Sequence, residues 1–389
     1  MKKILLIVNT DGALYVFRKP IIDAIISLGH IVTTISAESN YFNVLKKTGV
    51  NPISLDFSRH SASPIQNFIL FTKLYKLIKY QHPDIVHNFT HKPAIYGTIA
   101  AKLAGVKGIF ITITGLGTVF VREDIKSKLI RYLLLIQYKF ALQFSTKVYF
   151  QNPDDMEYFI NRKIVSSKKA ILTYGSGIDL NEYPQPSLND IEKAKSILSK
   201  ELQIDILKKT LILFPSRGVP EKGFIEFYKA AKLINQLFPN NYIFLHLGLI
   251  DLASSRQISK DGIDKLTHEC GVHYLGFKED IKNYMLAADI VTLPSYREGT
   301  PRSLIEALAL GKVVITTDVP GCRETVLDGW NGFLCKVGDA ISLATKLLAV
   351  DENLIIQSRT RSRNYCEIKY DAKWLVTLTI NNYMASTNE

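Results

Sequence analysis

The chain has 389 residues, which suits about two domains of ordinary size, and a hydrophobic content of 47% excludes bulk disorder. It has no run of about 18 or more apolar residues, so we predict no membrane span. The net charge of +12 lies entirely in residues 1–180, which hold 23 Lys and Arg and 11 Asp and Glu, whereas residues 181–389 hold 25 of each. This split favours an anionic partner for the first half (nucleic acid, a membrane surface or a phosphorylated ligand), although a lysine-rich composition alone would also raise the charge.

Short apolar runs alternate with longer amphipathic stretches in the first half of the chain. The runs predict strands at 4–8, 31–36, 52–55, 85–87, 108–113 and 148–150. The longer stretches predict helices at 20–28, 42–48, 64–80, 93–104 and 124–144. Such alternation predicts a parallel sheet covered by helices on both faces.

The pattern restarts after a proline-containing linker at 183–187. A polar helix is followed by strands at 211–215, 242–247, 290–293 and 313–316 and by helices at 224–237 and 301–310. We therefore predict an α/β chain of two doubly wound domains, residues 1–180 and 181–370, with a cleft between them. Residues 371–389 are expected to form a terminal helix that packs back toward the first domain.

The segment 295–306 (Ser-Tyr-Arg-Glu-Gly-Thr-Pro-Arg-Ser-Leu-Ile-Glu) directly follows a predicted strand. Thr300 suits the cap of a helix and Pro301 its first position. The free N–H groups and the positive dipole of a helix start suit a diphosphate. Gly299 would let such a ligand approach the backbone.

Two carboxylates accompany this helix start. Glu298 lies just before the helix and Glu306 about two turns into it. One can reach a sugar beyond the phosphates, and the other can accept hydrogen bonds from ribose hydroxyls. An ordinary capped helix with two solvated glutamates remains the alternative.

A second loop, residues 215–223 (Pro-Ser-Arg-Gly-Val-Pro-Glu-Lys-Gly), joins the first strand of the second domain to its helix, where open α/β sheets bind phosphate. Arg217 can make a forked contact with phosphate, and Lys222 supplies a compact point charge. Together they could neutralise a departing diphosphate. A polar strand-to-helix loop is the alternative.

Residues 273–277 (His-Tyr-Leu-Gly-Phe) precede a helix expected to begin near Glu279 or Asp280. Gly276 and Phe277 could seat a planar base through backbone contacts. Most segments of this kind, however, are simply strand ends.

In chain order, the Arg217–Lys222 loop, Leu275-Gly276-Phe277 and the pair Glu298 and Glu306 resemble the retaining glycosyltransferases of family 4. The resemblance spans the chain and implies the GT-B fold, two Rossmann-like domains with the donor held mainly by the second. It implies catalytic roles for Arg217, Lys222 and Glu298. It also implies donor contacts at Gly12 in the loop after the first strand, and at Ser216, Gly276, Phe277, Gly299, Thr300, Leu304 and Glu306.

The resemblance further implies that no metal is needed, and the sequence offers no convincing Asp-x-Asp site. The four cysteines are far apart, which indicates neither a zinc site nor a disulfide framework and favours a cytoplasmic protein.

The first domain resembles bacterial transferases that extend lipid-diphosphate-linked glycans, in the segments 17–20, 87–93 and 112–117. This resemblance implies acceptor contacts at Arg18, His91, Thr114 and Gly115. Many family members carry a histidine near the start of the segment 112–117, and this chain has none there. Either the branch dispenses with it, or His91 and the loop 114–117 share its role; a loop histidine that caps a strand end is the alternative for His91.

The stretch 124–144 combines basic and apolar residues, and a helix of this kind can lie in a membrane interface. We expect most of its leucines to face the domain core. Lysines and one or two exposed apolar side chains would then contact an anionic membrane. The basic residues are Lys126, Lys128, Arg131, Lys139 and, just beyond, Lys147.

These observations predict a retaining hexosyltransferase at the inner face of the cytoplasmic membrane. It would move a sugar from a nucleotide sugar, UDP-linked by resemblance, to a polyprenyl-diphosphate-linked saccharide in surface polysaccharide or glycan biosynthesis. The resemblance implies a front-face mechanism in which the leaving diphosphate helps to deprotonate the incoming hydroxyl. The alternatives are a nucleotide-sugar epimerase or phosphorylase on the same fold, and a non-catalytic scaffold of a glycan assembly complex. Nucleic acid is not an expected partner, because no aromatic-and-basic module is visible.

Overall fold

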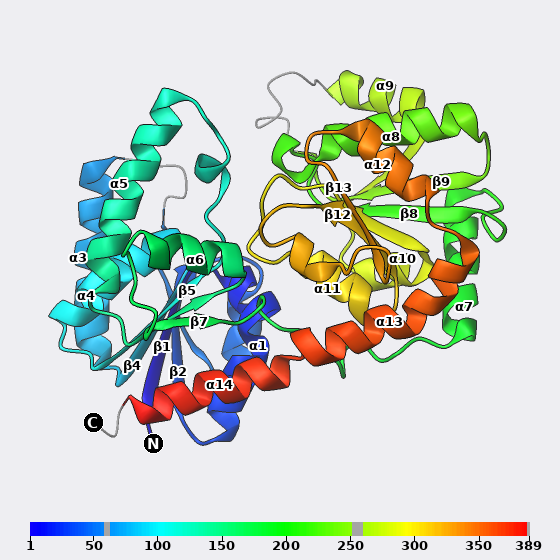
Figure 1. The fold of residues 1–389 in the computed structure, drawn as a ribbon. Coiled ribbons are helices and arrows are strands. Elements are labelled where there is room, and N and C mark those ends of the chain that lie inside the picture. Colours follow the sequence, from blue (N-terminus) through cyan, green and yellow to red (C-terminus); the bar gives the residue numbers. More distant parts are fainter. Residues whose placement is uncertain (58–62, 251–259, 387–389) are drawn as a thin grey trace. The chain divides into compact units, whose positions relative to one another are not determined.

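The computed structural model describes residues 1–57, 63–250 and 260–386. The chain divides into two compact units (Figure 1), one formed by Met1–Asp179 with Asp371–Glu389 and the other by Leu180–Tyr370. Each unit is built on one parallel sheet. The class of fold expected from the alternating pattern is therefore confirmed.

The first unit has a sheet of seven strands in the order β3-β2-β1-β4-β5-β6-β7. All six strands predicted for it are present, and β7 was missed because three partly exposed residues carry no clear alternation. Its strands are β1 (Lys3–Thr10), β2 (Ile31–Ala37), β3 (Asn51–Ser54), β4 (Ile85–Phe89), β5 (Gly108–Ile113), β6 (Lys147–Phe150) and β7 (Ala170–Leu172).

Helices cover both faces of this sheet. One face packs on α1 and α14, and the other on the layer formed by α3, α4, α5 and α6. The helices are α1 (Asp11–Ser27), α2 (Phe42–Lys47), α3 (Pro64–Gln81), α4 (Thr98–Leu103), α5 (Ile125–Leu142), α6 (Pro153–Asn161) and α14 (Ala372–Ala385), with a π-helical turn at Pro93–Gly97 and a 3-10 turn at Thr118–Phe120.

The first helix differs from the prediction, which placed its start at Pro20. Helix α1 begins at Asp11, directly after β1, and runs through Pro20. Proline removes one backbone hydrogen bond from a helix interior. Buried residues on both sides of it, Leu14 and Ile21 among them, hold the helix on the sheet despite that loss.

The second unit has six strands in the order β10-β9-β8-β11-β12-β13. The four strands predicted here are present, and the segment after 271 is a further full strand. The strands are β8 (Thr210–Pro215), β9 (Tyr242–Leu247), β10 (Val272–Gly276), β11 (Ile290–Leu293), β12 (Val313–Thr317) and β13 (Gly332–Cys335). The helices are α7 (Leu188–Leu202), α8 (Phe224–Leu237), α9 (Lys260–Cys270), α10 (Ile281–Ala287), α11 (Arg302–Ala309), α12 (Ala340–Leu348) and α13 (Glu352–Tyr370), with 3-10 turns at Pro220–Lys222 and Arg323–Thr325.

Both sheets reverse their winding direction between their first and fourth strands, β1 and β4 in one unit and β8 and β11 in the other. Chains leaving two such strands pass to opposite faces of the sheet and leave a crevice at the carboxyl ends. The loops that follow β1, β4, β8 and β11 are therefore where each unit is expected to bind ligands.

Candidate active site and acceptor-side residues

The loop after β8 carries Arg217 and Lys222. Arg217 is exposed, whereas Lys222 ends the short 3-10 turn and is only a quarter exposed. Gly223 follows with φ of +75°, and a Cβ there would overlap the carbonyl of Pro294 in the next loop. Glycine is required at this point because it tolerates both the backbone angle and the close approach.

The loop after β11 carries Glu298, whose side chain is 13% exposed. Its Oε1 accepts a hydrogen bond of 2.6 Å from the Ser295 hydroxyl and forms an ion pair with the Lys222 ammonium. The Glu298 amide donates to the carbonyl of Pro320, in the loop after β12. A half-buried lysine and carboxylate that are 76 residues apart in the chain are thus brought together.

The backbone also joins these two loops. The Tyr296 amide donates to the carbonyl of Glu221 over 2.9 Å. The Tyr296 hydroxyl donates to Glu226 Oε1 over 2.7 Å, and burial together with this carboxylate raises the pKa of the tyrosine to about 12. The loops of the winding reversal therefore form one connected structure, and Lys222 and Glu298 lie at its centre.

Helix α11 starts one residue later than expected. It begins at Arg302 after the cap position Pro301, and the Thr300 hydroxyl bonds to the carbonyl of Gly299 instead of capping the helix. Gly299 and Leu304 are buried. The order of the motif along the strand, loop and helix is nonetheless as predicted.

Glu306 lies one turn into α11, not two as expected, and is 8% exposed. Its Oε1 accepts hydrogen bonds from Arg302 Nε over 2.8 Å and from the Tyr183 hydroxyl over 2.9 Å. Sequence reasoning missed both partners. The spacing of Arg302 and Glu306 by four residues on a helix is a detectable signal, but Tyr183 in the linker offers none.

The segment expected to seat a base ends β10. Gly276 has φ of +67°, and its carbonyl accepts a hydrogen bond of 2.8 Å from the Gly248 amide at the end of β9. Phe277 is 64% exposed. Because β9 lies beside β8, this segment is at the same edge of the sheet as the Arg217 loop.

In the first unit, Gly12 does not lie in a loop. It belongs to the first turn of α1, and a Cβ there would meet the Tyr41 ring at 3.2 Å. The buried Asp11 carboxylate accepts hydrogen bonds from the amides of Gly12 and Ser39 over 2.6 Å each. The backbone at this strand end is therefore tightly held, which sequence reasoning did not foresee.

His91 follows β4 and is partly buried. Its Nδ1 lies 3.0 Å from the Tyr138 hydroxyl of α5, and burial together with the neighbouring Lys92 lowers its pKa to about 4. Thr90 just before it has φ of +67°, which is costly for a β-branched residue and is often found at functional sites. Thr114 and Gly115 follow β5, the neighbour of β4 in the sheet.

Arg18, an acceptor candidate, is only 5% exposed and lies over the Phe89 ring at 4.4 Å. Beside it the buried His87 contacts the Tyr383 hydroxyl with Nδ1 at 2.5 Å and the Thr112 hydroxyl with Nε2 at 2.8 Å. This group ties α14 to β4 and β5. Arg18 and His87 are therefore packed in the interior of the first unit, and the acceptor contact expected of Arg18 stays a prediction.

Two histidines, one in each unit, should make the protein sensitive to acid. His91 and the buried His246 of β9 both have a pKa lowered to about 4, mainly by burial. Since an unfolded histidine titrates near pH 6.5, the unfolded chain binds more protons than the folded one between pH 6.5 and 4. The free energy of unfolding is therefore highest above pH 6.5 and decreases as the pH falls. The decrease is about 1.3 kcal/mol per histidine between pH 7.5 and 5.5.

Urea unfolding at these two pH values measures this effect. His91→Gln should remove part of the pH dependence, whereas His268→Gln, at an exposed position of α9, should leave it as in the wild type. A wild-type free energy of unfolding that does not change between pH 7.5 and 5.5 would contradict the prediction.

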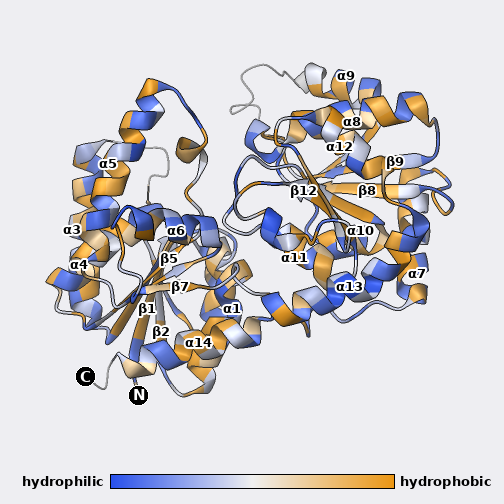
Figure 2. Ribbon diagram, in the orientation of Figure 1, coloured by the Kyte–Doolittle hydropathy of each residue, from blue (hydrophilic) through white to orange (hydrophobic). Residues whose placement is uncertain are grey.

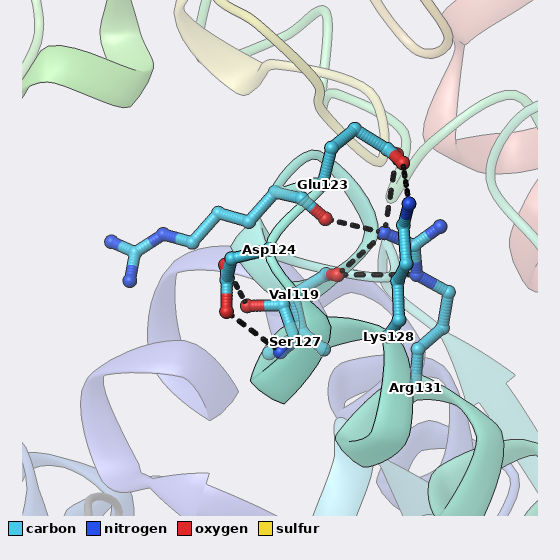
Figure 3. A network of polar contacts seen from close by, with 7 residues as sticks. Val119, Glu123, Asp124, Ser127, Lys128 and Arg131 are labelled. Atoms are coloured by element: carbon cyan, nitrogen blue, oxygen red, sulfur yellow. Dashed lines mark hydrogen bonds and ion pairs between the residues drawn. The ribbon is translucent and has the colours of Figure 1, made fainter.

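A polar network fixes the start of α5 (Figure 3). The Asp124 carboxylate caps the helix by accepting from the Ser127 amide over 2.9 Å, and Arg131 donates to the carbonyls of Val119 and Arg122. Lys128 pairs with Glu123 at 3.3 Å. Arg131 and Lys128 are thus partly engaged within the protein, which leaves Lys126 and Lys139 as the more open basic groups of this helix.

The apolar residues of α5 are more exposed than predicted. Only one or two were expected at the surface, but a row of six runs the length of the helix, with hydrophilic positions between them (Figure 2). The row is formed by Ile125, Leu129, Tyr132, Leu133, Ile136 and Phe140, which are 49–87% exposed. Apart from the adjacent pair Tyr132 and Leu133, successive members are three or four residues apart, which places the row on one face of the helix.

Comparison with known proteins identifies the class of enzyme. The profile of the glycosyl transferases group 1 matches residues 199–366, and that of the glycosyl transferase 4-like domain matches residues 3–152. The N,N'-diacetylbacillosaminyl-diphospho-undecaprenol alpha-1,3-N-acetylgalactosaminyltransferase of Campylobacter jejuni is 30% identical over 89% of each chain. The UDP-Gal:alpha-D-GlcNAc-diphosphoundecaprenol alpha-1,3-galactosyltransferase of Escherichia coli is 29% identical over 77% of this chain and 74% of its own.

Solved structures agree on the fold. Anabaena HepE, solved in complex with UDP and glucose, superposes with a TM-score of 0.75 and 20% identity over 99% of this chain and all of its own. Sucrose-phosphate synthase of Thermosynechococcus elongatus gives a TM-score of 0.78 at 18% identity over 99% of each chain. Two doubly wound units of this kind form the GT-B fold. The chain belongs to the group 1 glycosyltransferases of family 4, as its motifs predicted.

Proposed function

We propose that this glycosyltransferase moves a sugar from a UDP-sugar to a saccharide carried on a polyprenyl diphosphate, with retention at the anomeric carbon. The observation that carries the proposal is the pairing of Lys222 with Glu298 at the winding reversal of the second unit. It is supported by the two relatives above, whose names specify diphosphoundecaprenol-linked acceptors and, in one case, a UDP-linked donor.

In this proposal the second unit binds the donor. Arg217 and Lys222 hold the diphosphate, Glu298 contacts the transferred sugar and Glu306 the ribose. Ser216, Gly299, Thr300 and Leu304 line the phosphates and sugar, while Gly276 and Phe277 seat the base. Arg302 and Tyr183 orient the Glu306 side chain, since both donate to the same carboxylate oxygen.

The chemistry follows from these positions. The bond between the anomeric carbon and the diphosphate oxygen breaks, and the diphosphate leaves with the electron pair. The acceptor hydroxyl attacks the same face, and its proton passes to the departing diphosphate, so that the products are UDP and the extended glycan. Positive charge on Arg217 and Lys222 stabilises the leaving group most strongly as its charge develops.

We assign the acceptor to the first unit, with His91, Thr114 and Gly115 near its strand ends. His91 is neutral at physiological pH because its pKa is lowered to about 4. A neutral imidazole whose Nδ1 contacts Tyr138 keeps Nε2 for a hydroxyl group.

Nucleotide-sugar screening tests the proposal. UDP-sugars and GDP-sugars are compared for thermal stabilisation of the protein, and those that bind are offered with a polyprenyl-diphosphate-linked saccharide. We expect UDP-sugars to stabilise, by about 2.7 kcal/mol at a hundred times Kd, and one of them to be transferred. Failure of every nucleotide sugar to bind would refute the proposal, and a new sugar nucleotide formed without acceptor would instead indicate an epimerase.

We further propose that the surface formed by helices α3, α4 and α5 binds the anionic inner face of the cytoplasmic membrane. These three helices contain eight Lys and Arg residues and no Asp or Glu. To the exposed row of α5, helix α3 adds Ile65, Phe68 and Ile69, all at least 46% exposed. Each lysine near an anionic surface contributes about 1 kcal/mol. Within the described parts of the chain, no helix is long and apolar enough to cross a bilayer.

Substitution of three residues in the α5 row should weaken membrane binding. The triple variant Leu129→Ser, Leu133→Ser, Ile136→Ser removes about 1 kcal/mol of apolar burial per side chain. We expect binding to vesicles that contain anionic phospholipid to fall at least about tenfold, as measured by co-sedimentation. The matched control changes three exposed residues of the second unit, Leu188→Ser, Ile197→Ser and Ile368→Ser, and should bind like the wild type. Equal binding by both variants would contradict the assignment.

A further inference from the structure

A buried histidine lies directly beneath the Arg217 loop. His246, near the end of β9, is fully buried, and its Nε2 lies 3.0 Å from the carbonyl oxygen of Ser216. Its Nδ1 lies 3.0 Å from the hydroxyl of Tyr228, a buried residue of α8. The imidazole therefore joins the helix that follows β8 to the loop that leaves β8.

The partners determine which ring nitrogen carries the proton. A carbonyl oxygen only accepts hydrogen bonds, so Nε2 must be the donor to Ser216. The ring is neutral because burial lowers its pKa to about 4. Nδ1 then has a lone pair and accepts from the Tyr228 hydroxyl. The two hydrogen bonds therefore run in one direction: the Tyr228 hydroxyl donates to His246, and His246 donates to the Ser216 carbonyl.

The hydrogen bond also orients the peptide that precedes Arg217. In a trans peptide the N–H points away from the C=O. Because the Ser216 carbonyl points into the core toward Nε2, the Arg217 N–H points in the opposite direction. No backbone acceptor for this N–H is found among the described residues.

Tight packing leaves this peptide little freedom. A Cβ on Gly218 would lie 3.1 Å from His246 Cε1 and 2.6 Å from the Ile250 side chain. A Cβ on Gly248, which has φ of +140°, would overlap the Ser216 carbonyl. The Gly218 amide donates to the carbonyl of Leu249 over 2.9 Å. The loop thus contacts the segment that follows β9 at Gly248 and Leu249, and it contacts the imidazole of His246 within β9.

We propose that His246 is a positioning residue for the donor diphosphate. It holds the 216–217 peptide so that the amide and the guanidinium of Arg217 are presented together to the phosphate oxygens. Arg217 is exposed, and its side chain makes no hydrogen bond or ion pair with the described residues, so its placement depends on its backbone. This inference rests on the proposed function, in which Arg217 binds the diphosphate. Misplacement of a catalytic group by about 1 Å can lower a rate about a hundredfold.

Two amide substitutions separate positioning from packing. In His246→Gln the side-chain amide can still reach and donate to Ser216, whereas in His246→Asn it is too short and leaves the buried carbonyl unpaired. We expect kcat/KM for the donor to fall about 50-fold in His246→Asn, with weaker UDP binding, and to stay within about fivefold of wild type in His246→Gln. Tyr228→Phe keeps the bond to Ser216 and should also stay within about fivefold.

A purely structural role predicts a different result. It would lower Tm similarly in His246→Asn and His246→Gln and leave kcat/KM per folded molecule unchanged in both, and that outcome overturns the proposal. If His246→Asn does not fold, the tautomer of His246 in the wild-type protein is measured by ¹⁵N-histidine NMR. The His246 signal is assigned by its absence in His246→Gln. We expect the Nε2–H tautomer at pH 7. An Nδ1–H tautomer or an imidazolium there overturns it.

Failure of this inference is distinguishable from failure of the proposed function. If His246→Asn transfers sugar like the wild type while Lys222→Ala is inactive, the donor site is correct and the positioning role is wrong. If Lys222→Ala is active, the proposed donor site itself is wrong.

Discussion

Lys222→Ala is expected to abolish sugar transfer while the protein stays folded. In the proposed mechanism Lys222 places a positive charge beside the diphosphate as the bond to the sugar breaks. Removal of one such group from a preorganised site commonly lowers kcat by 10² to 10³, or about 3–4 kcal/mol of transition-state stabilisation. We expect a loss of about 10³-fold or more, because the same change also releases Glu298 from its ion pair.

Steady-state transfer to a lipid-linked acceptor measures this loss, and circular dichroism with Tm checks the fold. Lys229→Ala, at an exposed position of α8, is the matched control and should keep wild-type turnover. Lys222→Ala leaves a largely buried carboxylate without its cation, so we expect a Tm below that of the wild type in a protein that still folds. The double variant Lys222→Ala, Glu298→Gln removes both charges and should recover stability without recovering activity. Wild-type turnover in Lys222→Ala would refute the assignment.

Glu298→Gln should separate donor binding from turnover. The amide keeps the size of the side chain and can still accept from Ser295, so we expect little change in Tm. It loses the negative charge that holds Lys222 and that is proposed to contact the transferred sugar. We expect kcat to fall about 10²- to 10³-fold, since this contact is strengthened in the transition state.

Binding of UDP, which lacks the sugar, should change by less than about threefold in Glu298→Gln. Calorimetry of UDP binding together with transfer kinetics gives both quantities. Glu192→Gln, on the exposed face of α7, serves as the control. A variant that loses UDP binding and turnover to the same extent would show that Glu298 supports the loop and does not act on the sugar.

Local patterns were sufficient for the fold class and for placing the loop 215–223 and the segment 295–306 after strands β8 and β11. The strands at 242–247 and 290–293 and the helix at 224–237 appear with the same bounds in the structure, since buried strands and amphipathic helices have periodicities of their own. The order of the loop 215–223 and the segment 295–306 along the chain is also enough to recognise the family. Helix starts were less well predicted, because Pro20 and Pro301 are compatible with more than one position.

Contacts between distant residues could not be predicted in the same way. The bond from Tyr183 to Glu306 joins residues 123 positions apart. The bond from His246 to Ser216 joins residues 30 apart, one on β9 and the other in the loop that leaves the neighbouring strand β8. Neither spacing corresponds to a helix or strand repeat. The sequence predicted Arg217 as a ligand residue, but not the histidine that contacts the carbonyl of the preceding residue.

The surface of α5 likewise could be predicted only in part from the sequence. The sequence by itself determined that the helix near 125–142 is amphipathic and basic, and that all excess positive charge lies in the first half of the chain. Only the tertiary structure decided that six apolar residues of this helix face outward, because exposure depends on which neighbouring helices cover a face. Composition and periodicity are local properties, whereas the Lys222–Glu298 pair and the uncovered face of α5 depend on how distant segments pack.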